Sequence, residues 1–144
     1  MANVVGSSKP TSRVVSTGNT EIDKKLGGGI PLGSMTLIEG ESDSGKSVLS
    51  QQMIWGSLYD GFSVVLYTTE NTVKSFIRQM SSLSLEITDF MLLGKLKIFP
   101  ITASKLKLTP NQVLTLLLEH LARTDGLDLV VVDSLTTFIT HTSI

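Results

Sequence analysis

The sequence contains no cysteine, which excludes disulfide bonds and thiolate metal sites. It also lacks long apolar runs. The longest uninterrupted aliphatic or aromatic stretches, such as Leu129–Val132, have four residues, whereas a transmembrane helix needs about 20. The first residues contain no apolar segment of the kind found in a secretory signal. These absences fit a protein of the reducing cytosol.

The sequence also lacks a large excess of either charge: it has 12 basic and 13 acidic residues, and the net charge is −1. This balance argues against nonspecific nucleic-acid binding, which relies on basic surface, although it leaves a local basic groove open. The arginines are Arg13, Arg78 and Arg123. So few arginines disfavour a small-molecule kinase, which usually brings an arginine-bearing lid.

With 144 residues, 41% of them hydrophobic, the chain is long enough for one domain with a real core.

Apolar segments of strand length alternate with longer helical patterns along the chain. We predict strands at Met35–Ile38, Ser63–Thr68, Leu96–Phe99 and Leu129–Val132. Helices are predicted from the glycine-rich loop to about Tyr59, over Val73–Leu83, and after a capping signal at Thr109–Gln112. This order predicts an α/β fold, a mostly parallel sheet with helices on both faces. The aliphatic runs in the second and fourth strands are typical of central strands.

The strongest motif is the run Gly40-Glu41-Ser42-Asp43-Ser44-Gly45-Lys46-Ser47, which matches G-x-x-x-x-G-K-[ST] without a gap. Glycines let the backbone wrap a phosphate, and the following helix adds its positive N-terminal end. Lys46 can reach the β- and γ-phosphates, and the Ser47 hydroxyl can bind the bridging Mg²⁺. We therefore predict an ATP site, the Walker A element, formed by Gly40, Asp43, Ser44, Gly45, Lys46 and Ser47.

Two acids follow predicted strands. Asp133 comes directly after Leu129–Val132, the form of a Walker B element whose carboxylate accepts hydrogen bonds from Mg²⁺-bound water. An ordinary strand-ending aspartate is the alternative, and the phosphate loop upstream favours Walker B. Glu70 ends the run VVLYTTE and is the candidate catalytic residue, which would polarise the attacking water. Its alternative role is simply to favour the start of the next helix.

Other residues carry weaker signals. His120 and His141 show no metal-ligand spacing, so structural or exposed positions are expected. Trp55 lies among apolar residues of a helix, which favours core packing over a stacking role. Gly27–Gly29 is interpreted as a flexible joint, with a turn beside the nucleotide as the alternative.

The run STGNTEIDKKLGGGIPLGSMTLIEG, which leads into GESDSGKS, resembles the opening of the KaiC/RecA-like ATPases. In that family a T-G-x-x-x-[LI]-D-x-x-L-G-G-G-I-P-x-G segment precedes the phosphate loop. The closing VVVDSLT resembles the family's Walker B element. The resemblance extends from Thr17 to the last residue. Within the family, the sequence is most similar to the accessory ATPases of the archaeal flagellum (archaellum) motor.

The resemblance implies a RecA-like fold, ATP and Mg²⁺ as ligands, a cytoplasmic location and a homo-oligomer, often a hexamer. It also implies docking on the motor's secretion-type ATPase, FlaI, beneath a membrane platform. In KaiC-like ATPases two adjacent glutamates align with Thr69 and Glu70, so one acid of the pair is replaced here and rapid hydrolysis is in doubt. We expect a nucleotide-dependent assembly switch with slow or negligible hydrolysis. The alternative is a RecA paralogue that acts on DNA.

The expected domain organisation is a flexible arm at residues 1–16 followed by the ATP-binding domain at 17–144. The chain ends eleven residues after Asp133, whereas most sheets of this class continue. We therefore expect the C-terminal part of the domain, with its basic residues that act across a subunit boundary, to lie beyond Ile144.

Overall fold

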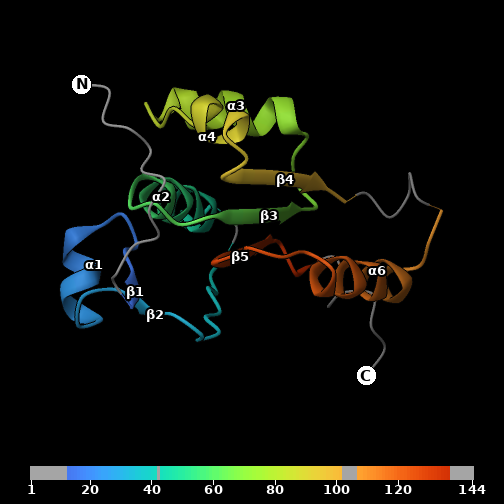
Figure 1. Cartoon of the computed structure of the whole chain (residues 1–144), viewed down its shortest axis with the longest axis horizontal. Coiled ribbons are helices and arrows are strands. Elements are labelled where there is room, and N and C mark those ends of the chain that lie inside the picture. The colour runs from blue at the N-terminus through green and yellow to red at the C-terminus, as the bar shows by residue number, and fades with distance from the viewer. Residues whose placement is uncertain (1–12, 42, 102–106, 137–144) are drawn as a thin grey trace.

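The computed structural model describes residues 13–41, 43–101 and 107–136, and Figure 1 shows the arrangement of their elements. In chain order these are β1 (Val14–Val15), α1 (Thr20–Lys25), β2 (Ile30–Pro31), α2 (Lys46–Tyr59), β3 (Val64–Thr68), α3 (Val73–Ser82), α4 (Thr88–Leu92), β4 (Leu96–Pro100), α6 (Pro110–Ala122) and β5 (Leu129–Asp133). The predicted α/β fold is confirmed. Three of the four predicted strands and all three predicted helices are present.

The main sheet is parallel, with strand order β4-β3-β5. Its register pairs Thr68 with Pro100 on one side and with Asp133 on the other. All three strands therefore end at the same edge. Because chain segments that follow these ends emerge side by side, residues far apart in sequence meet there.

Each face of the sheet has its own apolar core. Helices α2, α3 and α4 cover one face, where Ile54, Phe76 and Phe90 pack against Val64 and Leu66 of β3. On the other face α6 contributes Leu117, which packs against Val65 and Tyr67. Every residue of β3 is buried, as expected for a central strand with helices on both sides.

The helices begin where local sequence signals place them. Thr109 caps α6, because its hydroxyl accepts from the backbone N–H of Gln112 (3.3 Å) while the Gln112 side chain accepts from the N–H of Thr109 (2.9 Å). Thr72 and Ser75 form the same reciprocal arrangement at the start of α3. Such capping boxes satisfy N–H groups that have no partner within the helix.

The prediction of a strand at Met35–Ile38 is wrong for this structure. The segment has no regular structure, and its side chains face solvent, with Met35 97% and Leu37 64% exposed. A strand is stabilised by a partner strand, and none in the described part of the chain pairs with these residues. The phosphate loop is therefore entered from an extended, irregular segment.

The strand β5 also differs from its prediction as a central strand. It pairs with β3 alone within the described residues and forms an edge of the sheet. Its side chains are accordingly only half-buried, and Val130 is 37% exposed. An aliphatic run indicates a strand, but it does not reveal how many neighbours that strand has.

The folded part begins earlier than expected. The predicted arm included Val14 and Val15, which form β1 and pair in antiparallel fashion with β2. Val15 is buried, which a loosely packed arm would not achieve. Residues 1–12 of that arm lie outside the described residues. In the described part of the chain, no helix combines the length and apolarity needed to cross a membrane.

Candidate phosphate-binding site

The phosphate loop turns sharply into α2. Gly45, the residue before the helix, has φ +90°, and Asp43 has φ +63°; both lie in the left-handed region that reverses the chain direction. The N–H of Ser44 donates to the carbonyl of Glu41 (3.2 Å), which closes the turn. Ser42 lies outside the described residues. The motif thus forms a tight loop at a helix N-terminus, the geometry that suits an anion.

Gly40 lies close to the side chains of Ser44 and Lys46. A Cβ atom there would lie 2.5 Å from the hydroxyl oxygen of Ser44. The ammonium of Lys46, in the first turn of α2, folds over the loop and donates to the carbonyl of Gly40. Lys46 is therefore held above the loop, where its positive charge can meet a phosphate.

Asp133 stands at the end of β5, facing the start of α2. Burial and the negative charge of Glu70 raise the pKa of its carboxyl above the ordinary value. The positive charge of Lys46 and the polar side chain of Ser50 act in the opposite direction. The structure thus brings together Lys46, Glu70 and Asp133, three residues that the sequence analysis selected separately. Ser50 joins them from α2, and no motif pointed to it.

Glu70 lies in the segment Thr69–Thr72, between β3 and α3, which we call the Glu70 loop. The buried hydroxyl of Thr68 accepts from the backbone N–H groups of Glu70 and Asn71 (both 3.2 Å). The hydroxyl of Ser134 donates to the Glu70 carboxylate (3.0 Å). Glu70 therefore precedes α3 as its alternative role requires, and its carboxylate also lies beside Asp133.

The ends of β3 and β5 are joined by further hydrogen bonds. The N–H of Ser134 donates to the Thr69 hydroxyl (3.1 Å), and that hydroxyl donates to the Ser134 carbonyl (3.2 Å). The N–H of Thr69 donates to the carbonyl of Asp133 (3.0 Å). Thr69, the residue next to Glu70, thus has a hydroxyl rather than a carboxylate, and this hydroxyl joins the ends of β3 and β5. Sequence reasoning missed Ser134, because its role depends on a contact across 64 residues.

The donor set suits Mg²⁺ bound together with phosphates. Within the described residues, no three acidic or histidine side chains form a metal cluster. Mg²⁺ is usually held by one or two carboxylates plus phosphate oxygens and water rather than by a cage of protein ligands. Ser47, with its hydroxyl, and Asp133, with its carboxylate, carry hard oxygen donors that could serve such an ion, directly or through its water.

The T-G-x-x-x-I-D motif forms a structural unit of its own. Residues 14–31, which comprise β1, α1 and β2 and which we call the N-terminal cap, surround the Asp23 carboxylate with hydrogen-bond donors. The carboxylate accepts from the Ser16 hydroxyl (2.6 Å), the Thr17 N–H (2.8 Å) and the Thr17 hydroxyl (2.6 Å). Burial alone would raise the pKa of Asp23, but these bonds outweigh it and lower the pKa. This part of the motif thus organises the fold.

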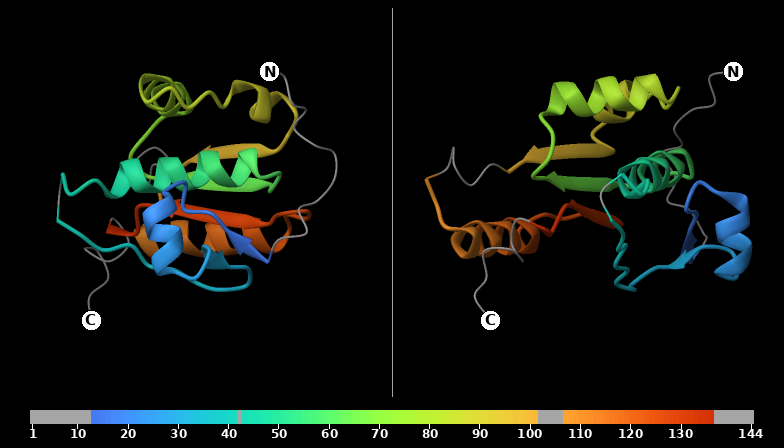
Figure 2. Two further views of the ribbon diagram at one scale, coloured as in Figure 1. Left: turned by 90° about the vertical axis from the view of Figure 1, so that its left-hand side faces the viewer. Right: turned by 180° about the vertical axis from the view of Figure 1, so that it is seen from behind.

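The N-terminal cap rests directly on α2. A Cβ atom at Gly18 would lie 2.7 Å from the carbonyl oxygen of Gln52, and one at Gly56 would lie 3.3 Å from the Cα of Gly18. Figure 2 shows α1 and the β1–β2 pair beside α2. Gly27, Gly28 and Gly29 all have positive φ and turn the chain from α1 into β2. The three glycines thus form the turn between α1 and β2, and their flexibility stays a prediction.

Two further expectations concern aromatic neighbours. His120 accepts or donates at Nδ1 toward the Tyr67 hydroxyl (2.7 Å) and packs edge-on against Phe99, so its role is structural. Trp55 is partly buried against the core and stacks on Tyr59, with ring centroids 5.1 Å apart. His141 lies outside the described residues.

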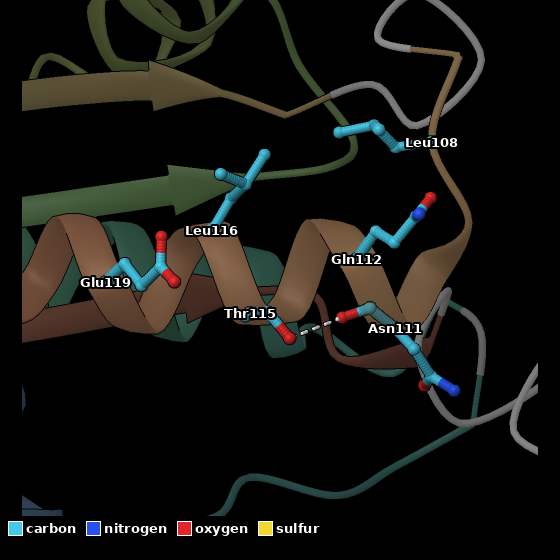
Figure 3. Close-up of a pocket in the computed structure, with 6 residues that line it drawn as sticks. All are labelled: Leu108, Asn111, Gln112, Thr115, Leu116 and Glu119. Atoms are coloured by element: carbon cyan, nitrogen blue, oxygen red, sulfur yellow. Dashed lines mark hydrogen bonds between the residues drawn. The ribbon is translucent and has the colours of Figure 1, made fainter.

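A separate hollow of about 400 Å³ lies along α6 and the residue before its cap (Figure 3). It is open to solvent, and its lining by described residues contains no basic side chain. Its lining consists of Leu108, Asn111, Gln112, Thr115, Leu116 and Glu119. Phosphates need positive charge or a row of free N–H groups, so this hollow does not compete with the loop as a phosphate site.

Comparisons with known proteins agree with this geometry. Residues 15–143 match the family described as "ATPase: KaiC". The archaeal flagellar ATP-binding protein FlaH of Sulfolobus acidocaldarius is 33% identical over 124 residues, which make up 85% of this chain and 54% of that protein. The crystal structure of the flagellar accessory protein FlaH from Methanocaldococcus jannaschii superposes with a TM-score of 0.69 at 30% identity, covering 92% of this chain and 58% of that one.

A DNA repair protein is also similar. RadA of Rickettsia bellii is 31% identical over 136 residues, which are 94% of this chain and 27% of that protein. The chain spans just over half the length of the two FlaH proteins. The resemblance to FlaH within the RecA-like superfamily is thus confirmed, and the chain belongs to the KaiC family of ATPases.

Proposed function

We propose that the chain binds Mg²⁺·ATP and acts as a nucleotide-dependent assembly switch in an archaellum motor. The observation that carries the proposal is the convergence of Lys46, Asp133 and Glu70 at the start of α2. Lys46 and the N–H groups of the phosphate loop would hold the phosphates. Ser47 would bind Mg²⁺, and Asp133 would orient its water shell.

Slow turnover follows from the composition of the Glu70 loop. One carboxylate of the loop, that of Glu70, is available to polarise an attacking water, because position 69 is a threonine, whose hydroxyl bonds to Ser134. The hydrogen bond from the Ser134 hydroxyl keeps the Glu70 carboxylate beside Asp133. A bound γ-phosphate would thus meet a fixed loop that joins two strands, which suits a switch that registers the nucleotide's presence.

The cellular setting is proposed from similarity. FlaH proteins are described as archaeal flagellar ATP-binding and accessory proteins. By that likeness we propose a cytoplasmic homo-oligomer, a hexamer with ATP near the subunit boundary. We propose that it docks on FlaI at the cytoplasmic face of a membrane platform.

A titration of the full chain with a fluorescent ATP analogue, with and without Mg²⁺, tests the proposal. The wild type should bind, and Lys46→Ala should lose at least about 100-fold in affinity, because several charge-assisted contacts depend on the ammonium. Circular dichroism should show an unchanged fold, since Lys46 takes no part in either core. An affinity of Lys46→Ala within threefold of wild type would sink the assignment.

The second candidate is a RecA paralogue acting on DNA, and the similarity to RadA favours it. The net charge of −1 weighs against it. Filter binding with single-stranded DNA in the presence of Mg²⁺·ATP separates the two. Retention of DNA that falls steeply with salt would support the repair function, and no retention would support the motor switch.

A further inference from the structure

We infer that Gln51, Gln79 and Asn71 are positioning residues whose side-chain amides link the helix of the phosphate loop to the Glu70 loop. The inference rests on the proposed function, in which the loop holds ATP and Glu70 faces the γ-phosphate. It concerns how the two halves of that site are kept in register.

The link consists of two amide–amide hydrogen bonds that connect three elements. Gln51 of α2 donates through Nε2 to Oε1 of Gln79 on α3 (2.9 Å). Gln79 in turn donates through Nε2 to Oδ1 of Asn71, the neighbour of Glu70 (3.0 Å). The Gln79 amide accepts one bond and donates the other. Accepting a bond polarises this amide and so strengthens the bond that it donates to Asn71. We call this chain of three side chains the amide relay.

The position of Gln51, the first member of the relay, is determined by the helix that follows the phosphate loop. Gln51 follows Ser47 by four residues in α2, so the two side chains lie on one face of the helix, one turn apart. Gln51 is only 3% exposed. A buried primary amide is costly unless it is hydrogen-bonded, so the bond to Gln79 is strongly favoured over an unpaired state.

The last member of the relay adjoins the catalytic candidate. Asn71 Oδ1 also accepts from the Ser75 hydroxyl (3.2 Å), and the Asn71 N–H donates to the hydroxyl of Thr68. The Glu70 loop is thus held toward α2 and α3 by the relay and toward β5 by Ser134. The position of the Glu70 carboxylate therefore depends on the elements at both ends of the loop.

The physical consequence is a coupling between loop and phosphates. A shift of α2 on nucleotide binding would be transmitted through Gln79 to Asn71, and hence to the backbone on which Glu70 stands. The hydrogen bonds from the loop to Thr68 of β3 do not depend on the position of α2. The relay therefore predicts that the loop's response to nucleotide can be lost while nucleotide affinity is retained.

Amide hydrogen exchange at Glu70 and Asn71, measured by NMR on the full chain with and without Mg²⁺·ATP, tests this coupling. In wild type we expect nucleotide to slow exchange at both amides. In Gln79→Leu the exchange should be roughly three- to tenfold faster without nucleotide, the scale of one hydrogen bond, and nucleotide should no longer slow it. The affinity for Mg²⁺·ATP should stay within about threefold, since the phosphates are held elsewhere.

Two further variants make the experiment specific. Gln79→Glu can still accept from Gln51 but cannot donate to Asn71, so it should release the loop as Gln79→Leu does. Lys74→Leu, an exposed change on the same helix, should behave like wild type.

Three outcomes would overturn the relay: wild-type exchange in Gln79→Leu, a wild-type response in Gln79→Glu, or a loss of affinity that parallels the faster exchange. Absence of ATP binding by the wild type would instead defeat the proposed function. In that case, unchanged exchange in nucleotide-free Gln79→Leu would still reject the relay.

Discussion

Two aspartates of this chain, Asp23 and Asp133, lie in environments that shift the carboxyl pKa in opposite directions. In the N-terminal cap, Asp23 accepts three hydrogen bonds, and its pKa is lowered. At the end of β5, Asp133 is half-buried beside the negative charge of Glu70, and its pKa is raised. The hydrogen bonds of the fold stabilise the charged form of Asp23, whereas the surroundings of Asp133 destabilise its charged form. Such a strained charge is typical of a site that meets a cation, and a satisfied one is typical of architecture.

The largest effect, on the ATPase rate, is expected at Glu70, whose charge raises the pKa of Asp133. Glu70→Gln should lower the ATPase rate of the full chain by roughly 100-fold or more if the carboxylate orients water. ATP binding should survive, because Lys46 and the loop backbone hold the phosphates. A sensitive assay of phosphate release, with the partner present, measures the rate. A Glu70→Gln protein with parental turnover would leave the residue as a helix-start acid only.

The packing of the N-terminal cap gives the next largest effect. Gly18→Ala places a Cβ atom 2.7 Å from the Gln52 carbonyl at φ +77°, so it should cost about 2–3 kcal/mol in the free energy of unfolding. Gly27→Ala is the matched control, because it has a similar φ of +74° but nothing within 4 Å. Its cost should be about 1 kcal/mol. Urea denaturation compares them, and equal losses would show that the contact with α2 is unimportant.

Asp133→Asn tests the strained charge directly. We expect roughly tenfold weaker ATP binding with Mg²⁺ and little change without it, since an amide keeps the shape but loses the charge that orders the ion's water. Equal losses in the two conditions would mean that Asp133 does not serve the metal.

The same variant should also show a change in stability. Because the folded pKa of Asp133 is raised, the folded state binds this proton more tightly than the unfolded state, so its contribution to stability falls as pH rises from about 4 through the folded pKa. Asp133→Asn should remove that fall and make the nucleotide-free protein more stable at neutral pH. Urea midpoints across this range measure it.

The smallest effect is expected at Asp23, with the opposite sign. Its pKa is lowered, so its stabilising contribution is present above the unfolded value near 3.8 and is lost as pH falls through the folded pKa. Asp23→Asn should therefore lower the free energy of unfolding near neutral pH by about 1 kcal/mol, at the low end for bonds to a charge because the group is partly exposed. Affinity for ATP should not change. A variant more stable than wild type would remove the contrast between the two aspartates.

Elements with local signals were predictable from the sequence. The capping box of α6, the apolar spacing of α3 and the apolar runs of β3 and β5 are each visible within a short segment of sequence. The capping box of α3 was found only in the structure. Met35–Ile38 carries a similar apolar run, yet it is not a strand, because a strand also depends on a partner elsewhere in the chain. The two-residue strands β1 and β2 are too short for any periodic pattern.

The site shows the same division. The phosphate loop is one uninterrupted motif, and the meeting of Glu70 with Asp133 follows once a parallel sheet places both strand ends on one edge. Ser50, Ser134 and the amide relay could not be predicted, because their roles arise from contacts between elements distant in sequence. Serine and glutamine are common polar residues, and their identity alone distinguishes no such role.

The placement of the single tryptophan has a spectroscopic consequence. Trp55 lies on α2 one turn beyond Gln51, and its ring stacks on Tyr59. Because no second indole exists in the sequence, tryptophan emission from this chain originates on the phosphate-loop helix alone. Its wavelength and quenching therefore follow the environment of that helix, and the native sequence carries its own optical probe about two turns beyond the phosphate loop.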